Sequence, residues 1–121
     1  MNIKRIFGCI ALTLAALTVS ADAAADPVGG RKTFGDTIGR DIEQHYDIVL
    51  RKEELTIVNV RGAGRSDIDC FIFDEDDNLV ASDQDSSDVC LLRVVPRWTG
   101  HFTIVIKNVG GQRTSYRGAA F

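Results

Sequence analysis

The chain has 121 residues, with 17 acidic and 14 basic side chains and a formal net charge of −3 at pH 7. This length suits one domain with a single hydrophobic core. The slightly acidic balance argues against binding to the phosphate backbone of nucleic acids. We therefore expect a small single-domain protein with no nucleic-acid partner.

Residues 1–23 have the three parts of a secretory signal peptide. A basic start, Lys4 and Arg5, precedes an apolar run that is too short to span a bilayer, and small residues follow. Cleavage after Ala23 or after Ala25 satisfies the rule of small residues around the cut. We predict a secreted or periplasmic protein with no membrane span once the signal peptide is removed.

The remaining sequence alternates short apolar and polar runs, separated by Gly, Asn and Asp. Residues 24–43 are Gly-rich and irregular, and we interpret them as a linker with an edge strand. Further strands are expected over residues 46–51, 55–61, 68–73, 79–82, 89–95, 102–107 and 116–121. Seven or eight short strands, spaced by about 8 to 12 residues, are typical of an antiparallel β-sandwich or barrel. The apolar strand residues expected in the core are Ile48, Leu50, Ile57, Val58, Val60, Ile68, Phe71, Phe73, Leu91, Val94, Phe102, Ile104 and Ile106.

Two cysteines remain after export, Cys70 and Cys90, because Cys9 is removed with the signal peptide. An oxidising compartment favours a disulfide between them. Two buried free thiols are the alternative. A metal site is a weaker interpretation, because no further soft ligand lies nearby in the sequence.

Three segments in order, "SDIDCFIFDEDDNLVASD", "VVPRWTGHFTIVIKNVG" and "TSYRGAAF", resemble the bacterial pre-peptidase C-terminal domain. The resemblance covers about residues 46–121, and we assign the domain to residues 44–121. It implies an eight-stranded, jelly-roll-like β-sandwich that serves secreted hydrolases in secretion, adhesion or stabilisation, with calcium bound in some members. Two features depart from the family: "RKEEL" stands where a Gly-bearing turn is common, and we expect the module to stand alone, with no catalytic domain before it. The matched positions are Asp67, Asp69, Phe71, Phe73, Asn78, Leu79 to Asp83, Gly100, Phe102, Asn108 and Tyr116.

Aspartates around the two cysteines are candidate calcium ligands, because calcium prefers six to eight oxygen ligands. Asp67 and Asp69 are expected on one face at a strand entry, about 6 to 7 Å apart along the chain. Ligands from other loops would complete the site. The alternative is a set of solvated acidic loops. The predicted metal-site residues are Asp67, Asp69, Asp83, Asp85 and Asp88.

The segment "DEDDNL" resembles the start of an EF-hand loop, with Asp74, Asp76 and Asn78 at alternate positions. Leu79 replaces the glycine that such a loop requires, and Asp85 rather than Glu falls at its twelfth position. Since predicted strands lie on both sides, we interpret the segment as a hairpin turn.

Trp98 is the only tryptophan, and it lies in the predicted strand break "PRWTG". Exposed tryptophans often anchor a binding partner, so Trp98, Arg97 and His101 form a candidate binding site. Packing of Trp98 over the end of the sandwich is the alternative.

Neither histidine, His45 or His101, stands in a sequence setting typical of a catalytic nucleophile and its base. We predict a non-catalytic secreted module that adheres to protein or polysaccharide, with calcium as a candidate stabilising ion. The alternative is an accessory, chaperone or inhibitor partner of an exported hydrolase.

Overall fold

The structure, a computed structural model, describes residues 26–121, and the predicted signal peptide lies outside this range. Residues 26–121 form eight strands and no helix, and therefore contain no helix that could cross a membrane. The strands are β2 (Lys32–Ile38), β3 (Glu43–Leu50), β4 (Thr56–Gly62), β5 (Ile68–Phe73), β6 (Leu79–Asp83), β7 (Val89–Val94), β8 (Gly100–Asn108) and β9 (Thr114–Ala120).

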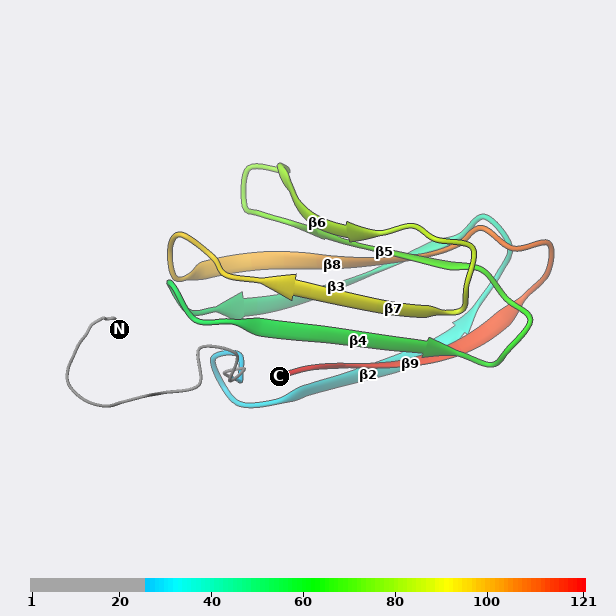
Figure 1. Cartoon of the computed structure of the whole chain (residues 1–121), viewed down its shortest axis with the longest axis horizontal. Helices are drawn as coiled ribbons and strands as arrows, with labels where there is room; N and C mark the ends of the chain where they lie inside the picture. The colour runs from blue at the N-terminus through cyan, green and yellow to red at the C-terminus, as the bar shows by residue number, and fades with distance from the viewer. Residues whose placement is uncertain (1–25) are drawn as a thin grey trace.

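The strands form two four-stranded antiparallel sheets, in the orders β2-β9-β4-β7 and β3-β8-β5-β6 (Figure 1). The first strand pairs with the last, the second with the next to last, and so inward to the β5–β6 hairpin. The chain is thus one long nested hairpin rolled into two layers, which is the jelly-roll arrangement. The predicted all-β sandwich with jelly-roll topology and one disulfide is confirmed.

The strand nearest the N-terminus, β2, lies at the edge of its sheet, as predicted. It pairs with β9 from Lys32 to Ile38, and the Ile38 side chain is fully buried in the core. The sandwich therefore includes β2, and its first strand begins within the segment that the sequence predicts as a linker. The other predicted strands agree with the observed ones to within a few residues.

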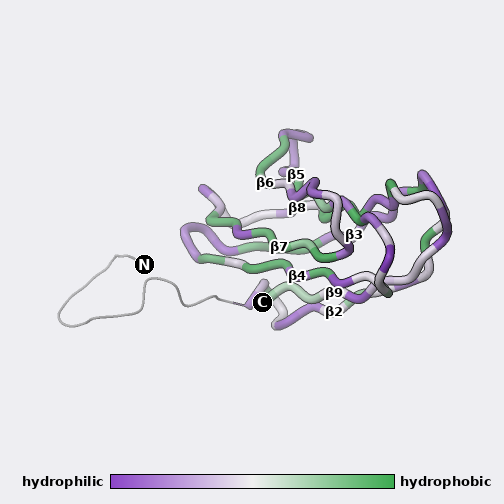
Figure 2. Tube along the Cα trace, turned by 45° about the vertical axis from the view of Figure 1, so that its right-hand side comes forward, coloured by the Kyte–Doolittle hydropathy of each residue, from purple (hydrophilic) through white to green (hydrophobic). Residues whose placement is uncertain are grey.

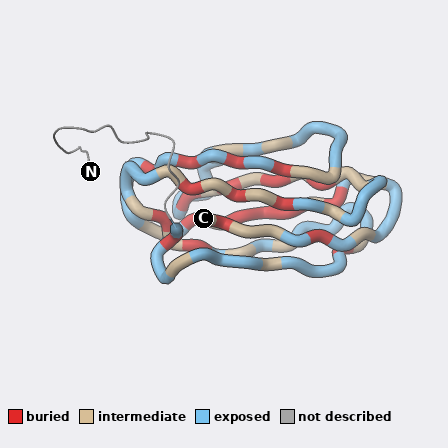
Figure 3. Tube along the Cα trace, turned by 60° about the horizontal axis from the view of Figure 1, so that its bottom comes forward, coloured by how far each residue is buried: buried red, intermediate tan, exposed pale blue. Residues whose placement is uncertain are grey.

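The core lies between the sheets because alternate residues of each strand point inward. Buried and exposed residues alternate along the strands in Figure 3, and hydrophilic residues gather in the loops in Figure 2. The expected core is confirmed at most positions, with four exceptions. Leu91 is 52% exposed, and Ile57, Phe71 and Phe73 are half-buried on outer faces.

The exceptions follow from strand parity. Cys70 and Ile72 are fully buried, so Phe71 and Phe73 on the same strand must point outward. Their rings stack with centroids 6.3 Å apart, which shields part of their surface from water. In β7 the inward positions belong to Cys90, Leu92 and Val94, so Leu91 faces solvent.

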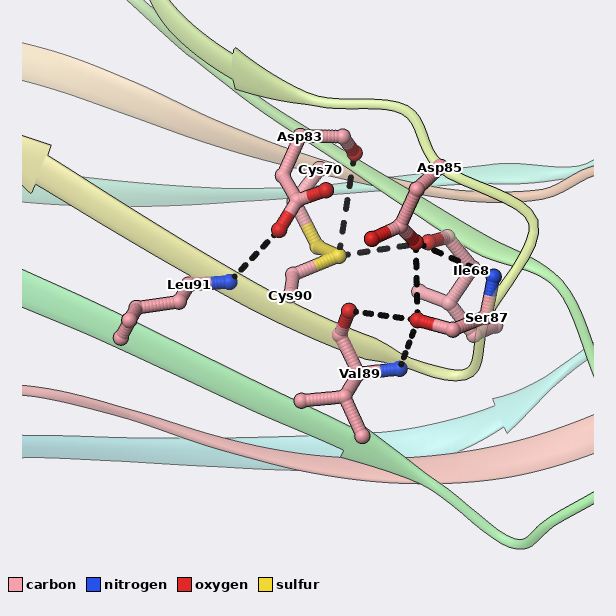
Figure 4. The surroundings of a disulfide bond; sticks show 8 residues. All are labelled: Ile68, Cys70, Asp83, Asp85, Ser87, Val89, Cys90 and Leu91. Atoms are coloured by element: carbon pink, nitrogen blue, oxygen red, sulfur yellow. Dashed lines mark hydrogen bonds between the residues drawn. A yellow bond between two sulfur atoms is a disulfide. The ribbon is translucent and has the colours of Figure 1, made fainter.

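The predicted disulfide joins Cys70 of β5 to Cys90 of β7, with Cα atoms 6.2 Å apart. These strands belong to different sheets, so the bond crosses the core (Figure 4). Both residues are fully buried. The bond therefore fixes the two layers to each other where no main-chain ladder can do so.

Near the edge formed by β2 and β9, aromatic residues from both sheets meet. Phe34 packs over Gly118, since a Cβ at that glycine would lie 2.3 Å from the Phe34 ring. The Phe34 ring also lies 4.5 Å from the ring of Tyr46 in the opposite sheet. The hydroxyl of Tyr116 hydrogen-bonds to Tyr46 and donates to Gln44, and burial raises the pKa of Tyr116 above its usual value. This edge of the sandwich is thus closed by packing and hydrogen bonds.

Candidate functional site

The two sets of predicted site residues lie at opposite ends of the sandwich. The loops that follow β2, β4, β6 and β8 meet at one end, on the right in Figure 1, and the loops that follow β3, β5 and β7 meet at the other. The predicted calcium ligands belong to the first end, in or beside the β4–β5 and β6–β7 loops. Trp98, Arg97 and His101 belong to the second, so the two sets do not form one site.

Asp67 and Asp69 have an unusual environment. One carboxylate oxygen of each, Oδ1, is buried and has no hydrogen-bond partner. Burial raises the pKa of Asp69, and the negative charges of Asp67, Asp83 and Asp85 raise it further, while Lys107 opposes them. Lys107 lies opposite Asp69 on β8. The Asp69 carboxylate therefore lies among negative charges that Lys107 only partly compensates.

The other three predicted ligands are each held by a main-chain N–H. Asp83 accepts from Leu91 across the β6–β7 corner at 2.9 Å, and Asp88 accepts from Gly64 in the β4–β5 loop at 2.7 Å. Asp85 accepts from the N–H and hydroxyl of Ser87 (Figure 4), and the hydroxyl bond is the main reason why its pKa is lowered. These carboxylates organise loops.

The fit to calcium is therefore partial. Within residues 26–121 no three His, Cys, Asp or Glu side chains come close enough together to hold a metal ion. The unpartnered oxygens of Asp67 and Asp69 are the groups that a cation would satisfy, and main-chain carbonyls or water would have to supply most of the six to eight ligands. Calcium binding stays a prediction, centred on this pair.

The segment predicted as a hairpin turn is confirmed as one between β5 and β6. The Asp74 carboxylate accepts hydrogen bonds from the N–H groups of Asn78 and Asp76, both at 2.9 Å, and from the Asn78 side chain. The N–H of Asn78 is the largest cause that lowers the pKa of Asp74. Asp77 has a left-handed backbone, with φ of 62°, as Asn and Asp tolerate in turns.

Trp98 packs over the end of the sandwich. Its ring stacks on Phe102 with centroids 5.9 Å apart, and its indole N–H donates to Glu75 Oε1 at 3.0 Å. The residue remains 38% exposed, and Arg97 and His101, which lie near it in the sequence, are exposed. Trp98 thus packs over the end of the sandwich, as the alternative interpretation predicts, and a binding role for it stays a prediction.

His45 pairs with Glu43 on the outer face of β3, at 3.1 Å. His101 is exposed on the outer face of β8, opposite Val49. The pair at His45 links side chains two residues apart on one exposed strand face, which is the geometry of a surface ion pair.

A surface that the sequence interpretation missed lies on the outer face of the β2-β9-β4-β7 sheet. It is a shallow basin of about 750 Å³ across β2, β9 and β4. Arg61 and Arg117 line it and lie directly opposite each other on neighbouring strands. The alternation of inward and outward residues along each strand predicts that both arginines face outward. Their pairing depends on the β4–β9 register, which has no local sequence signal.

No family model matches this chain, and no curated protein matches it. The fold nevertheless defines a class: the chain is an all-β, disulfide-linked jelly-roll sandwich. A solved structure with a similar fold is the periplasmic inhibitor of g-type lysozyme, PliG, from Aeromonas hydrophila. The match has a TM-score of 0.53 and 11% sequence identity, over 85% of this chain and 90% of that one. A likeness at this identity shows the fold alone.

Proposed function

We propose that this chain is a non-catalytic, exported protein that binds a hydrolase, as an inhibitor or accessory subunit. The observation that carries the proposal is the likeness of fold to a periplasmic lysozyme inhibitor over most of both chains. A buried disulfide between the sheets supports an oxidising compartment, where such a partner would act. The resemblance to the pre-peptidase C-terminal domain, itself a companion of secreted hydrolases, points to the same class of partner.

The site chemistry is in keeping with binding rather than catalysis. Asp83 and Asp88 at the acidic end hold loop main-chain groups, and the Trp98 ring packs on Phe102. The surfaces available to a partner are the outer faces of the two sheets and the two ends of the sandwich where the loops meet. Protein interfaces of standard size bury about 800 Å² on each partner, so a bound hydrolase would cover one face or end of the sandwich.

The direct test is inhibition of g-type lysozyme by the purified mature protein. Lysis of a peptidoglycan suspension is followed at increasing ratios of protein to enzyme, and binding is measured by calorimetry. We expect lysis to fall to a plateau at about one protein per enzyme, with a dissociation constant in the micromolar range or tighter. The same protein unfolded by reduction and heat is the matched control.

If the protein does not bind lysozyme, the tagged protein is used to capture other exported hydrolases from periplasm or medium. Capture of one hydrolase in a stoichiometric amount supports the proposal. Retention on insoluble polysaccharide with no enzyme partner contradicts it and favours the predicted adhesion module. Hydrolytic activity of the chain itself, abolished by one side-chain change, would contradict the non-catalytic part.

Calcium is a second proposal, which rests on the buried, unpartnered oxygens of Asp67 and Asp69. If calcium binds only the folded form, the melting temperature rises with added calcium, by an amount that corresponds to about 2.7 kcal/mol at a concentration of one hundred times Kd. Replacing Asp69 by Asn should remove most of that rise. An unchanged melting temperature across calcium and chelator contradicts the proposal.

Without calcium, Asp69→Asn is expected to stabilise the protein at neutral pH. The raised pKa of Asp69 means that its charged form is disfavoured in the folded state, so removing the charge helps by up to about 1 kcal/mol at this partly exposed position. The gain should shrink as the pH falls through the folded pKa, because the native carboxyl then protonates. Asp47→Asn, an exposed change on the same sheet, is the matched control.

A further inference from the structure

The outer face of the β2-β9-β4-β7 sheet and its adjoining loops concentrate positive charge on an acidic protein. Five of the 14 basic residues of the chain lie there, which we call the arginine face. Two line the basin across β2, β9 and β4, two line a second depression beside it, and one lies on β7. They are Arg61, Arg117, Arg65, Arg113 and Arg93.

Arg61 and Arg117 form the centre of the arginine face. Residues directly opposite each other on antiparallel strands have Cβ atoms about 4.5 to 5.5 Å apart, and like charges at that distance destabilise a sheet. Among residues 26–121 neither arginine forms an ion pair. Asp36, on the edge strand, is the one carboxylate that lines the basin. The pair therefore places two like charges side by side, with one carboxylate, Asp36, in the same basin.

The shape around this pair is concave because its neighbours are small. Gly35 lies opposite Arg117 on β2, and a side chain there would lie 3.6 Å from Cγ of Arg117. Ala119 and Ser115 flank Arg117 on β9, and they also line the basin. Two long cationic side chains thus stand over a floor of short ones, which leaves space for an incoming group between them.

We propose that the arginine face binds a carboxylate-bearing segment of a protein partner, with an Asp or Glu side chain seated between Arg61 and Arg117. Each guanidinium can donate two parallel hydrogen bonds to a carboxylate, and the incoming charge would relieve the repulsion within the pair. This inference extends the proposed function. It rests on that function only for the identity of the partner as a hydrolase.

Charge distribution favours an acidic protein segment over a long polyanion. The molecule is acidic overall, and the β4–β5 and β6–β7 loops beside this face carry Asp67, Asp85 and Asp88. A nucleic acid or anionic polysaccharide that tracked across the surface would meet these negative charges. A short acidic segment that reaches only the basin avoids them, and the uneven charge would orient its approach.

The test is a titration of the ¹⁵N-labelled mature protein with a hexaglutamate peptide, followed by amide chemical shifts. We expect the largest shifts in β4 and β9 around Arg61 and Arg117, with binding that weakens as salt increases. A hexaglutamine peptide should cause no such shifts. The double variant Arg61→Gln/Arg117→Gln should bind hexaglutamate at least tenfold more weakly, while its melting temperature stays the same or rises.

The matched control is Arg40→Gln/Lys52→Gln, which removes the same total charge from exposed positions off the arginine face. Equal weakening in this control would show a general charge effect and overturn the proposal. Shifts with an anionic oligosaccharide but none with hexaglutamate would also overturn it, and would identify the ligand as a polyanion. A lack of shifts with either probe would show that the face binds no carboxylate.

The enzyme assay separates this proposal from the proposed function. If the native protein inhibits a hydrolase and the Arg61→Gln/Arg117→Gln variant inhibits it equally well, the hydrolase docks elsewhere and this inference fails alone. If no hydrolase binds but hexaglutamate binds at β4 and β9, the proposed function fails and the acidic-segment site stands. Loss of inhibition in the variant, but not in the control, supports both.

Discussion

Replacing Cys70 and Cys90 by alanine is expected to lower the free energy of unfolding by about 3 to 5 kcal/mol. Closing a ring between residues 20 positions apart restricts the unfolded chain by about 3 kcal/mol on a loop-entropy estimate, and the lost packing of two fully buried residues adds to this. The bond is also the covalent link between the two sheets. Urea unfolding, followed by the fluorescence of Trp98, measures the change, because that ring stacks on core Phe102.

The native sequence in its reduced form separates the cross-link from the side chains. Reduction in urea and refolding with reductant present should reproduce most of the loss while keeping both sulfur atoms in the core. The slope of unfolding free energy against urea should increase in both forms, because an unfolded chain without the ring exposes more surface. A loss of less than about 1 kcal/mol in the double variant would contradict a stabilising role for the bond.

Strand positions in this chain could be predicted from sequence because each strand carries its own local signal. The apolar content of residues 68–73 and the turn residues on both sides predict a strand, and β5 has these bounds. The pairing could not be derived in the same way. β2 pairs with β9 across almost the whole domain, and nothing local in either strand specifies the other. Only the family resemblance predicts the jelly-roll order of the strands.

The direction of side chains was harder to predict where a strand is apolar on both faces. The run "CFIF" contains no polar residue to mark the outer face, so its sequence alone favours a core position for Phe71 and Phe73. The disulfide settles the matter, since a cystine that joins two sheets must point between them. Parity then places Ile72 inside and the two phenylalanines outside.

The candidate sites show the same limit. The closeness of the aspartates in sequence predicts one ligand set, and in the structure Asp83, Asp85 and Asp88 each hold a different main-chain group. Arg61 and Arg117 are far apart in sequence and become neighbours only through the β4–β9 ladder. Local patterns thus draw attention to residues that are adjacent in sequence, whereas neighbours created by strand pairing leave no local pattern.

Positions that carry the family resemblance have structural roles in this chain. Asn78 donates to Asp74 within the β5–β6 turn, and Tyr116 closes an edge of the core through its hydroxyl. Asn108 is fully buried and ties loops together. Residues of this kind preserve a fold and leave the partner unspecified. The proposed partner is therefore expected to contact exposed positions that are not among the matched residues, such as Arg61.

The side chain of Asn108 joins three main-chain groups at the end of the sandwich that carries the acidic loops. Its Nδ2 donates to the carbonyls of Ile38 at 3.2 Å and Gln112 at 2.8 Å, and its Oδ1 accepts from Gly110 N–H at 3.0 Å. Its own main chain pairs with Ile42 and Asp41. One residue thus connects the β2–β3 and β8–β9 loops.

Asn108→Ala is expected to lower the free energy of unfolding by about 2 to 4 kcal/mol, because it leaves main-chain groups at a buried position without hydrogen-bond partners. Each such group costs about 1 to 3 kcal/mol, and water that enters the site recovers part of this cost. Urea unfolding measures the loss, and Asn59→Ala on the outer face of β4 is the matched control. A loss below about 0.5 kcal/mol, equal to that of an ordinary surface change, would contradict this role.

Asn108→Asp distinguishes the amide donor from simple filling of space, because it keeps the size of the side chain but removes both N–H donors. A carboxylate would face the carbonyl oxygens of Ile38 and Gln112, so its folded pKa should rise above that of the unfolded chain. We expect this variant to be at least as unstable as Asn108→Ala at pH 7. It should recover relative to the native protein as the pH falls through the raised pKa, since the protonated acid can again donate one hydrogen bond. A loss that does not depend on pH would show that packing, rather than donation, makes Asn108 necessary.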